Sequence, residues 1–131
     1  MHSHHSQRIL VTSLIAIALL VAAAAPLVRA ADAKPKYTIK EVMKALHKGD
    51  DNIAKHVTKG AGTKEEFAKL VEYYESLPLN TPEKGDKGSW EEKSMALLKA
   101  SKALKAGEAD ALAGYKKAVN CKACHSVHKP D

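Results

Sequence analysis

The spacing of apolar residues constrains the fold most strongly, because it follows the helical period in four stretches and shows no sustained strand-like alternation. The first stretch, residues 38–48, places on one helical face Ile39, Val42, Met43 and Leu46. The other stretches cover residues 63–77, 89–105 and 108–121, with turn-rich segments between them. Four amphipathic helices with mostly short connections predict an all-α fold, arranged as an antiparallel four-helix bundle.

Helix start and stop signals support these boundaries. Thr63-Lys64-Glu65-Glu66 and Ser89-Trp90-Glu91-Glu92 both match the capping box, in which a hydroxyl and a carboxylate satisfy free amides at a helix N-terminus. Thr38 can cap the first helix, which Gly49 ends, and one short helical turn is expected near residues 53–57. The inner face of the third helix is predicted to carry Met95, Leu98 and Leu104, with Ser101 or the stem of Lys102 between them.

The first thirty residues have the layout of a secretory signal peptide. Residues 1–8 are basic and lack acids, residues 9–25 are apolar except for Thr12 and Ser13, and Val28-Arg29-Ala30 fits a cleavage site. The competing interpretation is an uncleaved anchor, although so short a run lies at the lower limit for spanning a bilayer. We therefore predict that the protein is exported, to the periplasm or otherwise, after cleavage of the signal peptide. Its single domain is predicted to comprise residues 31–131.

The predicted domain is mildly basic and has few large apolar residues. Both arginines, Arg8 and Arg29, lie in the leader, so the domain has nineteen lysines and all fifteen acids, a net charge of +4 (19 − 15). These charges are mixed along the chain, which is not the arginine-rich stripe of a nucleic-acid binder. The whole chain has one Phe, one Trp and four Tyr, and so small a domain usually needs a covalent or cofactor staple.

Cys121-Lys122-Ala123-Cys124-His125 is a C-x-x-C-H sequence, the attachment pattern of c-type haem. On a helix, positions i, i+3 and i+4 share one face. Two thiols can therefore add across the two vinyl groups at one edge of a haem, while the adjacent imidazole ligates the iron. The motif predicts one covalent haem c per chain, held by Cys121, Cys124 and His125.

Three other interpretations of the cysteine pair compete with haem attachment. A redox-active dithiol needs a βαβ setting, and none is visible in the sequence. A zinc site would need His128 to complete an awkward cluster, because there is no second cysteine pair. A plain disulfide between Cys121 and Cys124 would close a loop too short to stabilise the fold much.

With CKACH on the last helix of a bundle-forming chain, the sequence resembles the class II cytochromes c, the cytochrome c-prime type, over residues 38–129. In that family the first helix crosses the other face of the haem. Six-coordinate members carry a methionine in a segment similar to residues 39–46, which implies Met43 as the sixth ligand. Two arginines common in the family are absent from this chain, where Lys129 and, loosely, Ile39 or Lys40 stand instead. Any contact made by those arginines would have to come from lysine, which lacks the planar fork.

Several other side chains are candidates for a place near the haem. His47 lies at i+4 from Met43, and if it ligated the iron in place of Met43 the site would be bis-histidine. We expect it to be exposed to solvent, because it lies near the end of the helix. His128 is on the proximal side, where we expect a solvated position or a hydrogen bond near the haem edge. His56 is expected at the surface, Met95 in the core, and Trp90 as an anchor of the preceding loop. Only one of the two neighbours Tyr73 and Tyr74 can face inward.

The motif and the resemblance together predict a cytochrome that carries single electrons between redox partner proteins, with iron held by His125 and Met43. The alternative is a five-coordinate haem protein that binds nitric oxide or carbon monoxide, with Met43 packed away from iron. A third interpretation is a haem-free exported helical binding protein with a disulfide. No catalytic acid, base or nucleophile and no small-molecule substrate are expected, so the chain is not predicted to be an enzyme. Dimerisation through the first two helices stays open.

Overall fold

The computed structural model describes residues 33–131, and the predicted leader, residues 1–30, lies outside them. The described part is helical and contains no strand, which confirms the predicted all-α class. Its helices are α1 (Ile39–Leu46), α2 (Ile53–Thr58), α3 (Lys64–Tyr74), α4 (Lys87–Ala106), α5 (Ala111–Ala118) and α6 (Cys121–His128). No helix in this part of the chain is long and apolar enough to cross a membrane.

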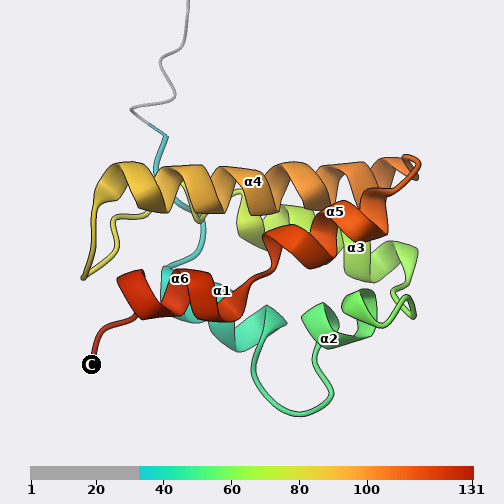
Figure 1. Ribbon diagram of the computed structural model, residues 1–131, viewed down its shortest axis with the longest axis horizontal. Coiled ribbons are helices and arrows are strands. Elements are labelled where there is room, and N and C mark those ends of the chain that lie inside the picture. Colours follow the sequence, from blue (N-terminus) through green and yellow to red (C-terminus); the bar gives the residue numbers. More distant parts are fainter. Residues whose placement is uncertain (1–32) are drawn as a thin grey trace, which may run out of the picture.

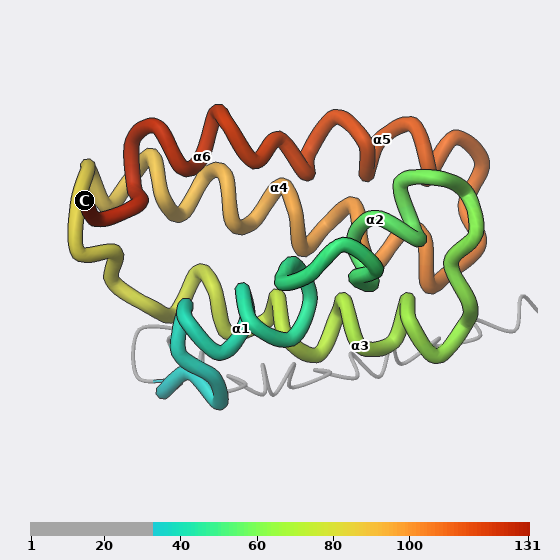
Figure 2. The backbone as a smooth tube through the Cα atoms, turned by 90° about the horizontal axis from the view of Figure 1, so that it is seen from below, coloured from blue at the N-terminus to red at the C-terminus, as the bar shows by residue number. Residues whose placement is uncertain are grey.

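Helix α4 is the central element of the arrangement, since it runs along the whole molecule (Figure 1). In the perpendicular view, α5 and α6 follow one another along one side of α4, and α1 and α3 lie along the other side (Figure 2). Helix α4 packs against α3, α5 and α6, while the short α2 packs against both α3 and α5. The arrangement is compatible with a helical bundle.

Two of the predicted helix starts are confirmed in detail. Thr38 and Thr63 cap α1 and α3, and each forms a complete capping box, with Glu41 and Glu66 respectively. The start predicted at Ser89 is wrong, because α4 begins at Lys87. Asp86 is the cap there, and its carboxylate accepts a hydrogen bond of 2.8 Å from the Ser89 amide. A carboxylate at this position also suits the positive end of the helix dipole.

The last predicted helix, residues 108–121, is divided in the structure. Helix α5 ends at Ala118, Val119 leaves the helical conformation with ψ of 47°, and α6 begins at Cys121. Asn120 causes the new start, because its side-chain oxygen accepts a hydrogen bond of 3.0 Å from the Ala123 amide. Asparagine often caps a helix in this way, in competition with continued helix. The C-x-x-C-H motif therefore begins a helix of its own.

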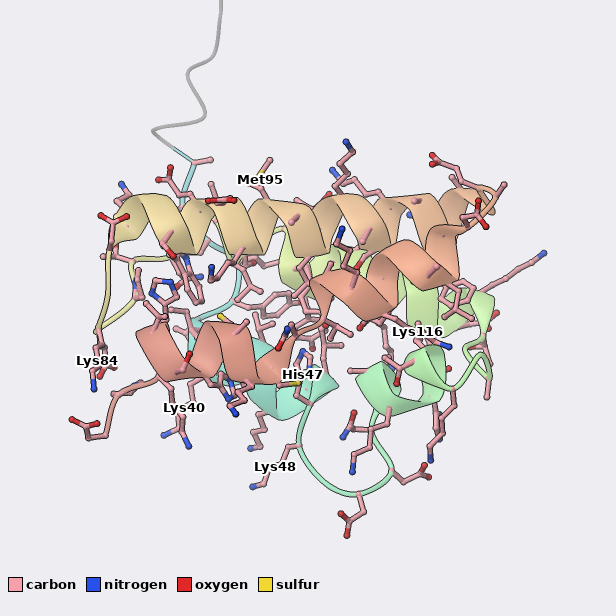
Figure 3. The ribbon with its side chains drawn as sticks, viewed as in Figure 1. Lys40, His47, Lys48, Lys84, Met95 and Lys116 are labelled. Atoms are coloured by element: carbon pink, nitrogen blue, oxygen red, sulfur yellow. The ribbon has the colours of Figure 1, made fainter. Side chains whose placement is uncertain are left out.

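The core lies where α3, α4 and α5 meet, with Leu70, Tyr74 and Tyr115 completely buried. The predicted core position of Met95 is wrong: its side chain is 52% exposed and points away from the bundle (Figure 3). The inner face of α4 instead carries Trp90, Ser94, Leu98, Ser101 and Leu104. Both serine hydroxyls donate to carbonyls one turn back on α4, at 2.7 and 2.9 Å, so their burial leaves no polar atom unsatisfied.

Two aromatic predictions are confirmed. Trp90 is buried and anchors the loop before α4, since its indole N–H donates to the Leu77 carbonyl at 2.8 Å. Of the two neighbouring tyrosines on α3, Tyr74 faces the core. Tyr73 lies nearer the surface and stacks on Tyr37, with ring centroids 4.2 Å apart.

Candidate functional site

A cavity of about 950 Å³ lies between α1 and α6 and is bounded by α4 on a third side. All four residues predicted to hold a cofactor line it, namely Met43 on α1 and Cys121, Cys124 and His125 on α6. Its volume is near the upper end of the roughly 300–1,000 Å³ typical of ligand sites. The fold thus brings to one cavity two helices from opposite ends of the described chain.

The cavity exists because α4 presents short side chains to it. Ala96, Ala100 and Ala103, one or two helical turns apart, line its wall together with the side chain of Leu97. Residues at this spacing share one helical face, and a row of methyl groups leaves room between α4 and its neighbours. A largely apolar wall of this kind suits a flat hydrophobic group.

The motif residues occupy the first turn and a half of α6, as predicted for a helical C-x-x-C-H sequence. Cys121 is exposed and Cys124 is half-buried, and the two are not joined by a disulfide. Burial raises the pKa of the Cys124 thiol, while the positive charge of Lys93 on α4 opposes this effect. Cys124 therefore faces into the molecule beside α4, and His125 follows it at the cavity.

His47 differs from its expected place, because it is half-buried and lines the cavity on the same helix as Met43. Its Nε2 lies 2.9 Å from the hydroxyl of Tyr74, and that hydroxyl lies 3.1 Å from the hydroxyl of Tyr115 (Figure 3 labels His47). Burial, and then the positive charge of His125, lower the pKa of His47 to about 4. Both imidazoles line the same cavity.

Of the two positions expected for His128, the solvated one is wrong, because its side chain is buried. Its Nδ1 is 3.1 Å from the Lys84 carbonyl, its Nε2 is 3.2 Å from the Ser89 hydroxyl, and its ring meets Trp90 edge-on. Because both ring nitrogens have partners in the α3–α4 loop and α4, His128 cannot complete a zinc site with the cysteines. It ties the end of α6 to the rest of the molecule.

The loop between α3 and α4 contacts His128 at a glycine, Gly85. A Cβ atom on Gly85 would lie 2.5 Å from Nδ1 of His128 and 2.8 Å from the Val127 carbonyl oxygen, which is closer than atoms can approach. Gly85 also has φ of +86°, a conformation that side chains disfavour. The close packing between this loop and α6 therefore requires a residue without a side chain.

Two further polar groups near the site were missed by the sequence interpretation. Asn52 caps α2, and its amide also donates to the carbonyls of His47 and Gly49, at 3.2 and 2.7 Å, so it fixes the end of α1. The signal was an asparagine just before a short helix. Tyr115 lies in the predicted helical stretch 108–121, and its hydroxyl contact with Tyr74 has no signature in the sequence.

The charged side chains around the cavity are mainly positive. Four lysines line it, from α2, α4 and α5, against the single carboxylate of Glu92: Lys55, Lys93, Lys99 and Lys117. Lys129, at the place where the resembling family has an arginine, is exposed and caps α6 with its amide, 3.2 Å from the His125 carbonyl. A cavity with this rim would favour a ligand that carries carboxylates.

His56 lies outside the cavity, as expected, and is partly exposed. Its ring bridges two acids, with Nδ1 2.9 Å from Glu66 and Nε2 2.5 Å from Asp51. These contacts, that with Glu66 first, raise the pKa of His56. It links the start of α3 to the loop before α2 and is a structural group.

The described residues contain no cluster of three or more histidine, cysteine, aspartate or glutamate side chains that could hold a metal ion alone. The arrangement instead places two thiols and an imidazole on one wall, and a thioether on another, around a mainly apolar space. Such a set can hold a flat, iron-bearing group rather than a bare ion. Comparisons of the chain with protein-family models, with curated proteins and with solved structures found no match.

Proposed function

We propose that the chain is an exported mono-haem c-type cytochrome, resembling the class II type, that carries single electrons between redox partner proteins. One observation carries the proposal: Cys121, Cys124, His125 and Met43, chosen from sequence, all line one cavity. In this proposal α1, α3, α4 and the α5–α6 pair correspond to the four helices of the family's bundle, and α2 is an additional short helix.

The residues present fit a haem. Each thiol would add its S–H across one vinyl group, with sulfur bonded to one carbon and hydrogen to the other. The imidazole of His125 would ligate the iron, and a bound haem would supply one-electron redox chemistry. The sulfur of Met43, on the opposite helix, would be the other ligand, and a thioether there favours the ferrous state. The lysines that line the cavity would supply positive charge to the carboxylates of a bound haem.

Intact mass tests the foundation of the proposal. Protein purified from cells able to attach haem should have the mass of the chain from Ala31 onward plus one haem. Cys124→Ala should lose most of the bound haem, whereas Ser126→Ala, an exposed neighbour on α6, should keep it. A colourless wild-type protein with both thiols unmodified would overturn the cytochrome assignment and leave the haem-free binding protein.

Spin state separates electron transfer from gas binding. We expect low-spin ferric iron with a methionine charge-transfer band in the wild type, and high-spin iron in Met43→Ala. Met95→Ala is the matched control, because it removes an exposed methionine from the outer face of α4 and should leave the spectrum unchanged. High-spin iron in the wild type would instead favour a five-coordinate protein that binds nitric oxide or carbon monoxide.

A further inference from the structure

Three polar groups connect the core to the cavity. The hydroxyl of Tyr115 lies 3.1 Å from that of Tyr74, which lies 2.9 Å from Nε2 of His47. Both tyrosines are completely buried, and His47 lines the cavity beside Met43. His47 is the C-cap residue of α1 and follows Met43 by four residues, so either side chain could ligate an iron bound at this wall. The hydrogen bonds decide between them.

The direction of this chain of hydrogen bonds follows from counting donors. Each phenol has one hydrogen to donate, and within residues 33–131 the Tyr115 hydroxyl has no hydrogen-bond partner other than Tyr74. If His47 donated to Tyr74, Tyr74 would donate to Tyr115, and the hydrogen of Tyr115 would be buried without an acceptor. In the opposite direction Tyr115 donates to Tyr74 and Tyr74 donates to His47, so the hydrogen of each buried hydroxyl has an acceptor.

This direction fixes the state of the imidazole. Nε2 of His47 accepts from Tyr74, so the ring is neutral and carries its hydrogen on Nδ1. A neutral imidazole has one lone pair in the ring plane, and Tyr74 occupies it. Nδ1 has no hydrogen-bond partner in the described part of the chain and is left as a donor. No nitrogen of this ring is then free to ligate iron.

We propose that Tyr74, supported by Tyr115, is a positioning residue that holds His47 as a hydrogen-bond acceptor through Nε2, keeps it off the iron and leaves Met43 as the sixth ligand. The choice of iron ligand rests on the proposed function, because it needs a bound haem. The position of the hydrogen on the His47 ring does not. The selecting group is the buried hydroxyl of Tyr74 on α3, which acts on His47 at the C-cap of α1, and the hydroxyl of Tyr115 on α5 donates to it from behind.

Replacement of Tyr74 by Phe removes the hydroxyl while keeping the ring that fills the core. In haem-loaded Tyr74→Phe, the Nε2 lone pair becomes free. We expect the methionine charge-transfer band to weaken, bis-imidazole signals to appear in magnetic-resonance spectra of the ferric protein, and the reduction potential to fall. Tyr73→Phe, the neighbour whose hydroxyl is not in this chain of hydrogen bonds, is the control and should match the wild type.

Two more variants sharpen the result. Tyr74→Phe combined with His47→Gln should recover the methionine band, because the competing ligand is gone. Tyr115→Phe should have little effect on ligation, since Tyr74 keeps its own hydrogen for His47. Unchanged spectra in folded Tyr74→Phe would overturn the inference, as would wild-type bis-imidazole signals that His47→Gln abolishes.

The ring itself can be observed in the purified wild-type protein by nitrogen NMR of the reduced state. We expect His47 with hydrogen on Nδ1 and a hydrogen-bonded, unprotonated Nε2. A ring protonated at Nε2 overturns the inference whether or not haem is attached. Intact mass reports haem attachment separately, so a failure of the proposed function and a failure of this inference give different results.

Discussion

The two halves of the molecule are held together by different means. Around α3, α4 and α5, large side chains such as Leu70, Tyr74 and Tyr115 are completely buried against one another. Between α1 and α6, in contrast, the two helices line a cavity, and a polar group holds one end of each helix: Asn52 at α1 and His128 at α6. Apolar packing accounts for the first half, whereas the second half surrounds a largely apolar cavity and is held at its ends by hydrogen bonds.

Leu70→Ala should give the largest loss of stability, because the residue is fully buried on α3 in the packed half. Truncation of such a leucine costs about 2–5 kcal/mol in lost transfer energy and cavity formation. Urea unfolding followed by circular dichroism measures the loss. Leu79→Ala, at a position 36% exposed, is the control and should cost far less. Equal losses would remove the contrast between the packed half and the surface.

His128→Ala should give the next largest effect, about 1–3 kcal/mol, because it leaves the Lys84 carbonyl and Ser89 hydroxyl without their partner. The loss should be local, with faster amide hydrogen exchange in α6 than in α3. Ser126→Ala, on the same helix and exposed, should leave exchange unchanged. Exchange that increases evenly over all helices would show that α6 is not separately anchored.

His56→Gln should have a smaller, pH-dependent effect. The raised pKa of His56 means that its folded state binds a proton more tightly than the unfolded chain. Its stabilising contribution is therefore present below pH 6.5, the ordinary value, and is lost as pH rises through the higher folded pKa. The difference between wild type and variant in urea unfolding, measured over this range, should shrink with pH and with added salt. A difference that grows with pH would contradict the assignment.

Met95→Gln should have the smallest effect, within about 0.5 kcal/mol, since substitutions at exposed helical positions are usually near neutral. Thermal unfolding of the variant beside the wild type gives the comparison. A loss approaching that of Leu70→Ala would mean that the outer face of α4 is covered, against its exposure in the structure.

The sequence was sufficient to predict that the fold is helical and where α1 and α3 begin. The two capping boxes that begin with threonine can be predicted because each depends only on residues within one helical turn. The prediction failed at Ser89, where the capping-box match placed the helix start, because the helix begins two residues earlier and tolerates Gly88 in its first turn behind the Asp86 cap. It also failed at Asn120, since an asparagine inside a helical pattern either continues the helix or caps a new one, and only the tertiary packing decides.

The site was predicted from local spacing on α6 and from a resemblance for Met43, and the cavity brings these residues together. The surroundings of His47 and His128 could not be predicted, because their partners Tyr74 and Lys84 lie far away along the chain. Met95 was misplaced for a different reason: two buried serines, Ser94 and Ser101, take the inner positions that a hydropathy pattern reserves for larger apolar residues.

Gly85 shows how a distant position governs the geometry of the sulfurs. The loop touches the end of α6 at a point where only a hydrogen atom fits, so even an alanine there would act as a wedge under the last turn. Helix α6 is short and carries Cys121 and Cys124 in its first turn. A tilt of its last turn would therefore also change the positions of both sulfurs relative to the cavity. The tolerance for variation at residue 85 is thus set by the alignment of a motif with which it shares no direct contact.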